Sequence, residues 1–145
     1  MKNILLLVLL TFIYGCSEYI PIAGGKLQGT LTLPPGDWTE IAKADIIELE
    51  TNPADPYSVK LWVIGKGTDL YVHAGDNRAR WVEHMEIDPN VRLLIDGKLF
   101  ELSSVRVESA DEFTVFANVY EEKYGNRPRN ENVNEAYLFR LVPRD

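Results

Sequence analysis

Cysteine, histidine and methionine are scarce in this sequence, whose 145 residues include one cysteine, two histidines and two methionines. A single cysteine excludes an intrachain disulfide and a zinc site built on several cysteines. The histidines, His73 and His84, have no carboxylate at metal-ligand spacing on a shared helix face, so we expect no metal site. An apolar core alone must therefore hold the fold.

Basic residues are also in the minority, with 15 lysines and arginines against 22 aspartates and glutamates and a net charge of −7. An acidic surface repels the phosphate backbone of nucleic acids, so we expect no nucleic acid as a partner. It repels anionic lipids as well, so a basic patch is not expected to hold the protein on a membrane. Beyond residue 14, no apolar run approaches the ~20 residues that a membrane-spanning helix needs.

The one long apolar run lies at the start of the chain. Lys2 precedes the uncharged residues 4–14, and Gly15 and the sole cysteine, Cys16, follow them. This order is typical of a secretory signal, whose apolar core is too short to span a bilayer stably. The Ile-Tyr-Gly-Cys sequence at 13–16 resembles the lipobox of bacterial lipoproteins, in which the cysteine is lipidated and becomes the new N-terminus.

The alternative is an ordinary cleaved signal with an incidental cysteine, but the position of Cys16 where the apolar run stops favours lipidation, for example with palmitate. Ser17 in place of Asp favours sorting to the outer membrane. We therefore expect a signal peptide at 1–15, a tether at 16–25 and a lipid-anchored domain facing the periplasm at 26–145. Removing 15 of the 145 residues leaves 130, which fits a single domain.

The rest of the chain reads as short strands separated by turns. Apolar residues on both faces of 59–64 predict a central strand, and Asp96-Gly97 predicts a hairpin turn. A change in the parity of the apolar residues at Ser103-Ser104 predicts a bulge, or a strand that bends from one side of a barrel to the other. The expected strands are 26–33, 45–51, 59–64, 70–74, 91–95, 98–109 and 136–142.

Two helices are expected before residue 90. Asp37 and Glu40 are spaced to cap a short helix that carries Trp38, Ile41 and Ala42. A second helix over 78–88 ends before Pro89 and carries, on one face, Trp81, Val82 and Met85.

A third helix is expected over 109–124. Ser109 and Glu112 have the spacing of a capping box, and Gly125 is a helix-ending residue. The apolar side chains follow helical spacing at Phe113, Phe116, Ala117, Tyr120 and Tyr124. Short antiparallel strands with helices in the long connections predict a mainly β single domain, a small barrel with two or three peripheral helices.

Residues 67–107 resemble the split β-barrel proteins that bind flavin or deazaflavin. The shared parts are Arg80-Trp81-Val82, the Asp-Pro-Asn-Val-Arg-Leu sequence at 88–93 and the Asp96-Gly97 turn. The resemblance is greatest to the deazaflavin-dependent nitroreductase branch, beside the pyridoxamine-phosphate-oxidase-like proteins, and it extends over about residues 45–142. It implies a split barrel, FMN or a deazaflavin as cofactor, a homodimer, and reduction of a small organic acceptor.

One loop departs from this family's pattern. The relatives carry a Gly-Arg-Lys-type loop that binds the cofactor phosphate, whereas residues 52–57 read Asn-Pro-Ala-Asp-Pro-Tyr. This loop has no glycine and no cation, and its two prolines remove two N–H donors. It is therefore a poor phosphate site by charge and by donor count.

The remaining candidates for cofactor binding are Lys60, His73, Arg78, Arg80 and Trp81. Lys60 lies where the relatives often have a cation facing the cofactor, and Arg78 and Arg80 lie at a predicted helix start, which attracts phosphate. The alternative is that these three cations are solvated surface charges. His73 ends a predicted barrel strand beside Gly75-Asp76, and no catalytic residue is identified.

Aromatic side chains form the other candidate set: Trp62, Trp81, Phe116, Tyr120 and Tyr124. They could line a pocket for a flat ring, or they could be ordinary core residues. Two functions therefore stay open. One is a lipid-anchored oxidoreductase that uses FMN or a deazaflavin, and the other is a non-catalytic envelope protein, without that cofactor, that binds a small ligand or another envelope protein.

The lipobox makes a first prediction. Because the acyl chains on Cys16 would be the only membrane attachment, Cys16→Ala should move the protein from the membrane fraction to the soluble fraction. Fractionation of cells that express either form, followed by immunoblotting, measures this. An unchanged distribution would contradict lipidation.

Overall fold

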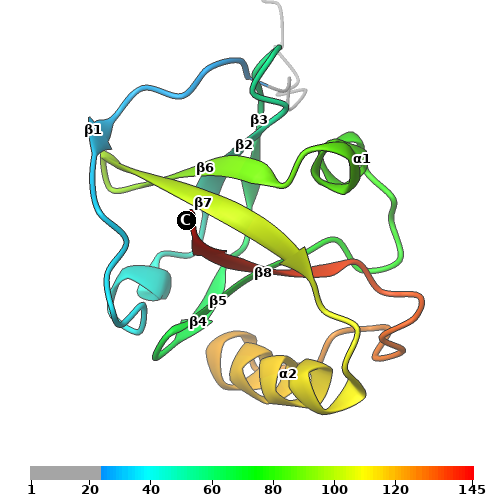
Figure 1. Ribbon diagram of the computed structural model, residues 1–145. Helices are drawn as coiled ribbons and strands as arrows, with labels where there is room; N and C mark the ends of the chain where they lie inside the picture. Colours follow the sequence, from blue (N-terminus) through cyan, green and yellow to red (C-terminus); the bar gives the residue numbers. More distant parts are fainter. Residues whose placement is uncertain (1–23) are drawn as a thin grey trace, which may run out of the picture.

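The computed structural model describes residues 24–145, which form a mainly antiparallel half-barrel sheet with two α-helices (Figure 1). The predicted signal peptide, Cys16 and most of the tether lie outside the described residues. The elements are β1 (Thr30–Leu31), the 3₁₀ helix η1 (Ile41–Lys43), β2 (Ile47–Thr51), β3 (Tyr57–Leu61), β4 (Ile64–Lys66), β5 (Asp69–His73), α1 (Arg80–Ile87), β6 (Asn90–Ile95), β7 (Lys98–Arg106), α2 (Ala110–Tyr124) and β8 (Leu138–Pro143).

The two ends of the sheet are consecutive strands of the chain. The strand order is β3-β2-β6-β7-β8-β5-β4, and only Trp62 and Val63 separate β3 from β4. This two-residue link therefore connects opposite ends of the strand order, as expected for a sheet that curls into a split barrel. Figure 1 shows α2 beside the β4–β5 end and α1 at a separate place near β2 and β3.

The curled sheet has apolar side chains on both faces. One cluster fills the barrel and includes Trp38, Leu49, Leu70, Val72, Trp81, Phe100 and Leu102. The other lies between the sheet and α2 and includes Ile64, Tyr71, Val107, Phe113, Phe116 and Leu138. Because successive side chains of a strand point to opposite faces, β5 contributes Leu70 and Val72 to the first cluster and Tyr71 to the second.

The hairpin predicted at Asp96-Gly97 is confirmed. Both residues have positive φ, 48° and 75°, and β6 pairs with β7 from Ile95↔Lys98 outward. Positive φ at both central positions matches the right-handed twist of the flanking strands. The pair of strands forms the middle of the sheet.

The bulge predicted at Ser103-Ser104 is wrong. β7 runs unbroken, pairing with β6 through Ser103 and with β8 from Leu102 to Arg106 without an extra residue. The burial pattern agrees better with the other alternative, a strand that passes from one side to the other. The strand leaves the barrel cluster and reaches the α2 cluster, in which Val107 is buried, while Val105 stays 40% exposed.

The central strand predicted at 59–64 is also wrong. β3 stands at one end of the strand order and pairs along its length only with β2, and the chain leaves the strand at Trp62. The apolar residues on both faces belong to two short strands, because Val59 packs on the barrel cluster and Ile64 on the α2 cluster.

The strand and the short helix predicted for the first part of the domain are both shorter than expected. Only Thr30–Leu31 of the strand predicted at 26–33 forms a strand, and Leu31 and Leu33 are 65% and 88% exposed. The short helix is a single 3₁₀ turn, and the carboxylate of Asp37 accepts a hydrogen bond from the Thr39 amide (2.8 Å). Trp38 is nevertheless buried, with its ring edge on Phe100 at 5.1 Å.

The two longer helices are confirmed. In α1 the predicted residues Trp81, Val82 and Met85 are buried. In α2, Ser109 Oγ accepts a hydrogen bond from the Glu112 amide (3.3 Å), and Gly125 ends the helix at φ 76°. The Glu112 carboxylate does not serve as the second half of a capping box, because it accepts hydrogen bonds from Tyr71 and Arg140 instead.

The Lys123 ammonium group fixes α2 to the rest of the barrel. It donates hydrogen bonds to the carbonyl oxygens of Ala42 (2.8 Å), Ala44 (2.7 Å) and Val63 (2.8 Å). These carbonyls belong to η1, to the residue after it and to the link between β3 and β4. Because the group is partly buried, the pKa of Lys123 is lowered.

A second prediction follows from these three hydrogen bonds. Lys123→Met removes the donor but keeps the apolar stem, so the free energy of unfolding should fall by about 2 kcal/mol. Urea denaturation measures this change. Lys66→Met is the matched control. Lys66 on β4 forms an exposed ion pair with Glu122 of α2, and this pair should be worth less than ~0.5 kcal/mol. Equal losses in the two variants would contradict the role given to Lys123.

Candidate functional site

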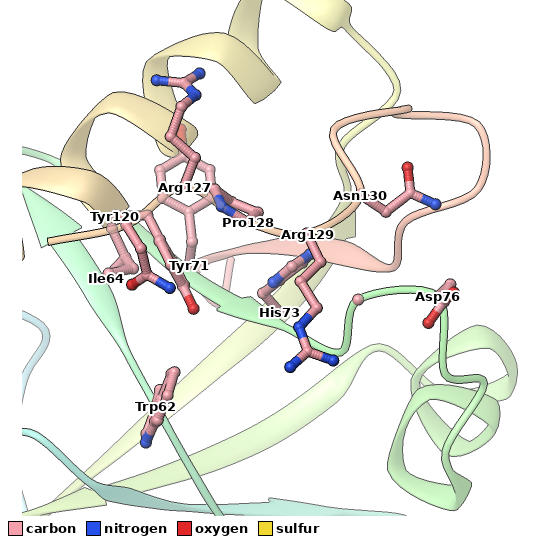
Figure 2. Close-up of a pocket in the computed structure, with 12 residues that line it drawn as sticks. Trp62, Ile64, Tyr71, His73, Asp76, Tyr120, Arg127, Pro128, Arg129 and Asn130 are labelled. Atoms are coloured by element: carbon pink, nitrogen blue, oxygen red, sulfur yellow. The ribbon is translucent and has the colours of Figure 1, made fainter. Parts of the chain in front are cut away.

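A pocket of about 760 Å³ lies between α2, the β4–β5 hairpin and the loop that follows α2 (Figure 2). Drug-sized and cofactor ligands bind in cavities of roughly this size, ~300–1,000 Å³. Its lining residues are Trp62, Ile64, Tyr71, His73, Gly75, Asp76, Tyr120 and residues 126–130.

Aromatic rings form one wall of this pocket. Trp62, in the link between β3 and β4, is 55% exposed and stacks on Tyr124 with ring centroids 4.7 Å apart and planes at 24°. Tyr120, one turn earlier on α2, lies 5.0 Å from the Tyr124 ring and 5.7 Å from Phe116. A large exposed indole beside further rings is a surface on which a flat conjugated molecule can stack.

The His73 imidazole lies at the end of β5, against this aromatic group. Its ring contacts Phe116 at 5.1 Å and Phe113 and Tyr120 at 6.2 and 6.4 Å. Burial lowers the pKa of His73 to about 4, so the ring is neutral at neutral pH. Its Nε2 is buried and has no hydrogen-bond partner among residues 24–145. A buried polar atom of this kind is uncommon, and a ligand in the pocket would be a suitable partner.

Tyr71 supplies a hydroxyl group to the same pocket. The hydroxyl donates a hydrogen bond to Glu112 Oε1 (3.1 Å), and that carboxylate also binds Arg140. Burial and the nearby acidic groups raise the pKa of Tyr71, so the hydroxyl keeps its proton. The network fixes one end of α2 to β5 and β8, beside the pocket.

The loop after α2 brings positive charge to the rim of the pocket. Arg127 and Arg129 both line it, with the buried Pro128 between them. Arg127 is neutralised by Glu121 (3.1 Å) and Glu131 (2.6 Å). In Figure 2 the Arg127 side chain points away from His73, whereas Arg129 extends beside it.

Of the residues proposed from the sequence as cofactor ligands, only His73 lines this pocket. Lys60 is exposed on β3. Arg78 forms exposed ion pairs with Glu83 and Glu86, and Arg80 lies over the Tyr57 ring at 5.9 Å. The structure therefore places these three cations away from the pocket.

The aromatic candidates are divided between the pocket and the barrel core. Trp62 and Tyr120 line the pocket, while Phe116 and Tyr124 contact these rings from behind. Trp81 is 5% exposed in the barrel cluster, near Phe139. Trp81 is therefore a core residue.

The loop at 52–57 forms a tight turn closed on itself. Asn52 has φ 56° and its side-chain amide donates to the Asp55 carbonyl (2.9 Å), while the Asp55 amide donates to the Asn52 carbonyl (3.0 Å). The Asp55 amide is therefore already bonded and is not available to a phosphate group. Residues 52–57 therefore do not fit the phosphate of a bound cofactor.

Tyr71, Arg127 and Arg129 were missed as pocket residues by sequence reasoning. Tyr71 lies between two core positions of β5, so its own pocket-facing role is visible only once α2 covers that face of the strand. The sequence Asn-Arg-Pro-Arg-Asn at 126–130 was a usable signal, because it places two cations close together in an acidic chain.

Neither a metal site nor a membrane helix is found in the described part of the chain. No group of three or more histidine, cysteine, aspartate or glutamate side chains within residues 24–145 is arranged to hold a metal ion. Over the same residues, no helix has the length and apolar character needed to cross a bilayer.

The His73 environment makes a third prediction. In the unfolded chain the imidazole has a pKa of 6.5, and in the folded chain about 4, so between these values the unfolded chain binds more protons. Stability should therefore fall on acidification, and His73 should account for about 1 kcal/mol of the loss between about pH 7.5 and about pH 5.5. His73→Phe should remove that share, as measured by urea denaturation at the two pH values. An identical loss in both proteins would contradict a buried, neutral His73.

Comparison with protein-family models found no match, and comparison with curated protein sequences found none either. Solved structures do match. A protein from Listeria innocua provisionally assigned as a pyridoxamine 5′-phosphate oxidase has a TM-score of 0.57 at 14% identity, over 74% of this chain and 90% of that one.

Two further matches carry the names of cofactors. The heme storage protein HutZ from Vibrio cholerae has a TM-score of 0.57 at 18% identity, over 74% of this chain and 87% of that one. An F420 reductase has a TM-score of 0.52 at 15% identity, over 77% of this chain and 96% of that one. At such identities the likeness concerns the fold, and this chain has the split-barrel fold of these proteins.

Proposed function

We propose that this chain is a lipid-anchored envelope protein whose split barrel binds a flat, conjugated ligand of the flavin or deazaflavin kind in the pocket beside α2. The observation that carries the proposal is the pairing of an exposed indole, Trp62, with the buried and unpartnered Nε2 of His73 in one pocket. The indole offers a stacking surface, and the imidazole offers one directed hydrogen bond.

The pocket suits a ring system better than a flexible chain. Its aromatic side chains are held by each other and by α2, so little conformational entropy is lost when a rigid ring stacks on Trp62. The single neutral imidazole matches a ligand with a hydrogen-bonding edge, such as the nitrogen and carbonyl groups of a flavin. The side chains of the pocket therefore favour a ring-shaped ligand.

The solved structures support the same ligand class. F420 is a deazaflavin, and heme is also a flat conjugated ring, so two of the matched proteins are named for a flat conjugated ligand. The resemblance of residues 67–107 to flavin- and deazaflavin-binding split barrels agrees with this. Because fold alone does not determine function, the proposal rests on the pocket and takes the fold as support.

A flavin or deazaflavin bound here would itself supply the chemistry of hydride transfer to a small organic acceptor. The chain's own residues would hold and orient the ring. Trp62 and Tyr120 provide the stacking surface, and His73 provides a neutral hydrogen-bonding group. Tyr71 keeps its proton and stays bonded to Glu112, so it serves as a fixed part of the wall.

A second candidate function is ligand binding without catalysis, and the loop at 52–57 favours it. This loop is closed by its own hydrogen bonds and carries Asp55, so the phosphate site of the oxidoreductase relatives is missing there. In this case the barrel would hold a small molecule or another envelope protein. The lipid anchor at Cys16 and a homodimer are parts of the proposal that rest on sequence resemblance.

The fourth prediction tests the pocket directly. FMN is titrated into the full-length protein in detergent, and binding is followed by the visible absorbance and fluorescence of the flavin. Trp62→Ala should weaken binding roughly tenfold, because a stacking surface worth about 1–1.5 kcal/mol is removed. Lys60→Ala and Arg80→Ala serve as controls, because neither residue lines the pocket, and both variants should bind as the unaltered protein does.

Two results would contradict the pocket. One is no flavin binding at high FMN concentration, and the other is loss of binding in Lys60→Ala with no change in Trp62→Ala. The two candidate functions are separated by a redox assay. A bound flavin that is reduced and then reoxidised by a nitroaromatic acceptor faster than free FMN supports the oxidoreductase, and an equal rate supports simple binding.

A further inference from the structure

We propose that the pocket selects a ligand whose ring carries an anionic group, and that Arg129 binds this group. The inference deepens the proposed function and rests on it. It assigns the anion to the loop after α2 in place of Lys60, Arg78 and Arg80, the cations that the sequence suggested.

Most cations of the described chain already have partners. Lys43, Lys66, Arg78, Arg92, Arg127, Arg140 and Arg144 face carboxylates within 4.0 Å. Lys123 binds three carbonyl groups, and Arg106 donates to the Ala136 carbonyl. In an acidic protein with net charge −7, a cation that binds no ligand is expected to pair with a nearby carboxylate.

Arg129 differs from these cations in two respects. It is exposed and lines the pocket, yet within residues 24–145 it forms no ion pair and no hydrogen bond. In Figure 2 its side chain extends beside His73. A guanidinium group offers a planar fork of donors that matches a phosphate or a carboxylate.

Arg127 provides the internal comparison. It lies two residues away in the same loop and lines the same pocket, but it donates to Glu131 (2.6 Å), Glu121 (3.1 Å) and Asn118 (3.0 Å). Its charge is used to fix the loop to α2. The two arginines have therefore divided their roles, one holding the loop and the other facing the pocket.

The loop itself is held in place, which keeps Arg129 near the pocket. Pro128 is buried, and the Asn130 side chain donates to Glu135 (2.8 Å) while its Oδ1 accepts from the Asn132 amide (2.9 Å). A cation presented on a fixed loop loses less conformational entropy on binding than one on a free chain.

Asp76 is the opposing charge. It is exposed on the turn after β5 and is the only carboxylate among the described lining residues of the pocket. Its field weakens the attraction of the pocket for an anion, so removing its charge should strengthen binding of an anionic ligand and leave a neutral one unaffected.

The experiment compares FMN with riboflavin, which has the same ring and no phosphate. Both are titrated into the full-length protein in detergent, with flavin fluorescence as the readout. FMN should bind about tenfold more tightly than riboflavin. Arg129→Gln should bring the two affinities together by weakening FMN alone, and Asp76→Asn should widen the difference. Arg78→Gln is the control, since its side chain is paired elsewhere, and should keep the original ratio.

The outcomes separate the two proposals. Equal affinities for FMN and riboflavin in the unaltered protein overturn the inference about Arg129 and leave the ring pocket standing. An FMN preference that survives Arg129→Gln, or that is lost in Arg78→Gln or Lys60→Ala instead, places the anion elsewhere and also overturns it. Binding of neither flavin overturns both proposals. A preference that disappears only in Arg129→Gln, with riboflavin affinity unchanged, supports the assignment.

Discussion

The three hydrogen bonds of Lys123 are the constraint on which the rest of this structure depends. They join α2 to the link between β3 and β4, where the chain passes from one end of the strand order to the other. A primary ammonium group has three donors, and here each of them reaches a carbonyl. Because Val63 is held in this way, its neighbour Trp62 is presented to Tyr124 on the same helix.

The pocket exists because one sheet supports two apolar clusters. Alternation along β5 buries Leu70 and Val72 in the barrel and directs Tyr71 and His73 to the face that α2 covers. The helix and the loop after it lie over the β4–β5 end of this face and leave a cavity with aromatic and polar walls. The cost of burying the His73 imidazole without a partner is then tolerated at a place where a ligand can supply one.

The two loops of the fold differ in what they offer to an anionic group. The turn at 52–57 is closed by Asn52 and Asp55, so the barrel does not offer a phosphate site there. Positive charge lies instead in the loop after α2. Arg127 there is paired with Glu121 and Glu131, whereas Arg129 lines the pocket without an ion pair within residues 24–145. Loops vary more readily than the strands that support them, so the anion site that we propose on the loop after α2 is compatible with the split-barrel fold.

The sequence by itself determined the elements that depend on local spacing: α1 and α2, the Asp96-Gly97 turn and the mainly β split-barrel class. It failed where an apolar pattern had two causes, because the strand expected at 59–64 is two short strands and the parity change in β7 marks a passage between two clusters. It found His73 but not Arg129. Only the tertiary structure decided which cations are neutralised. An ion pair depends on side chains that the fold brings together, and their distance cannot be predicted from local spacing in the sequence.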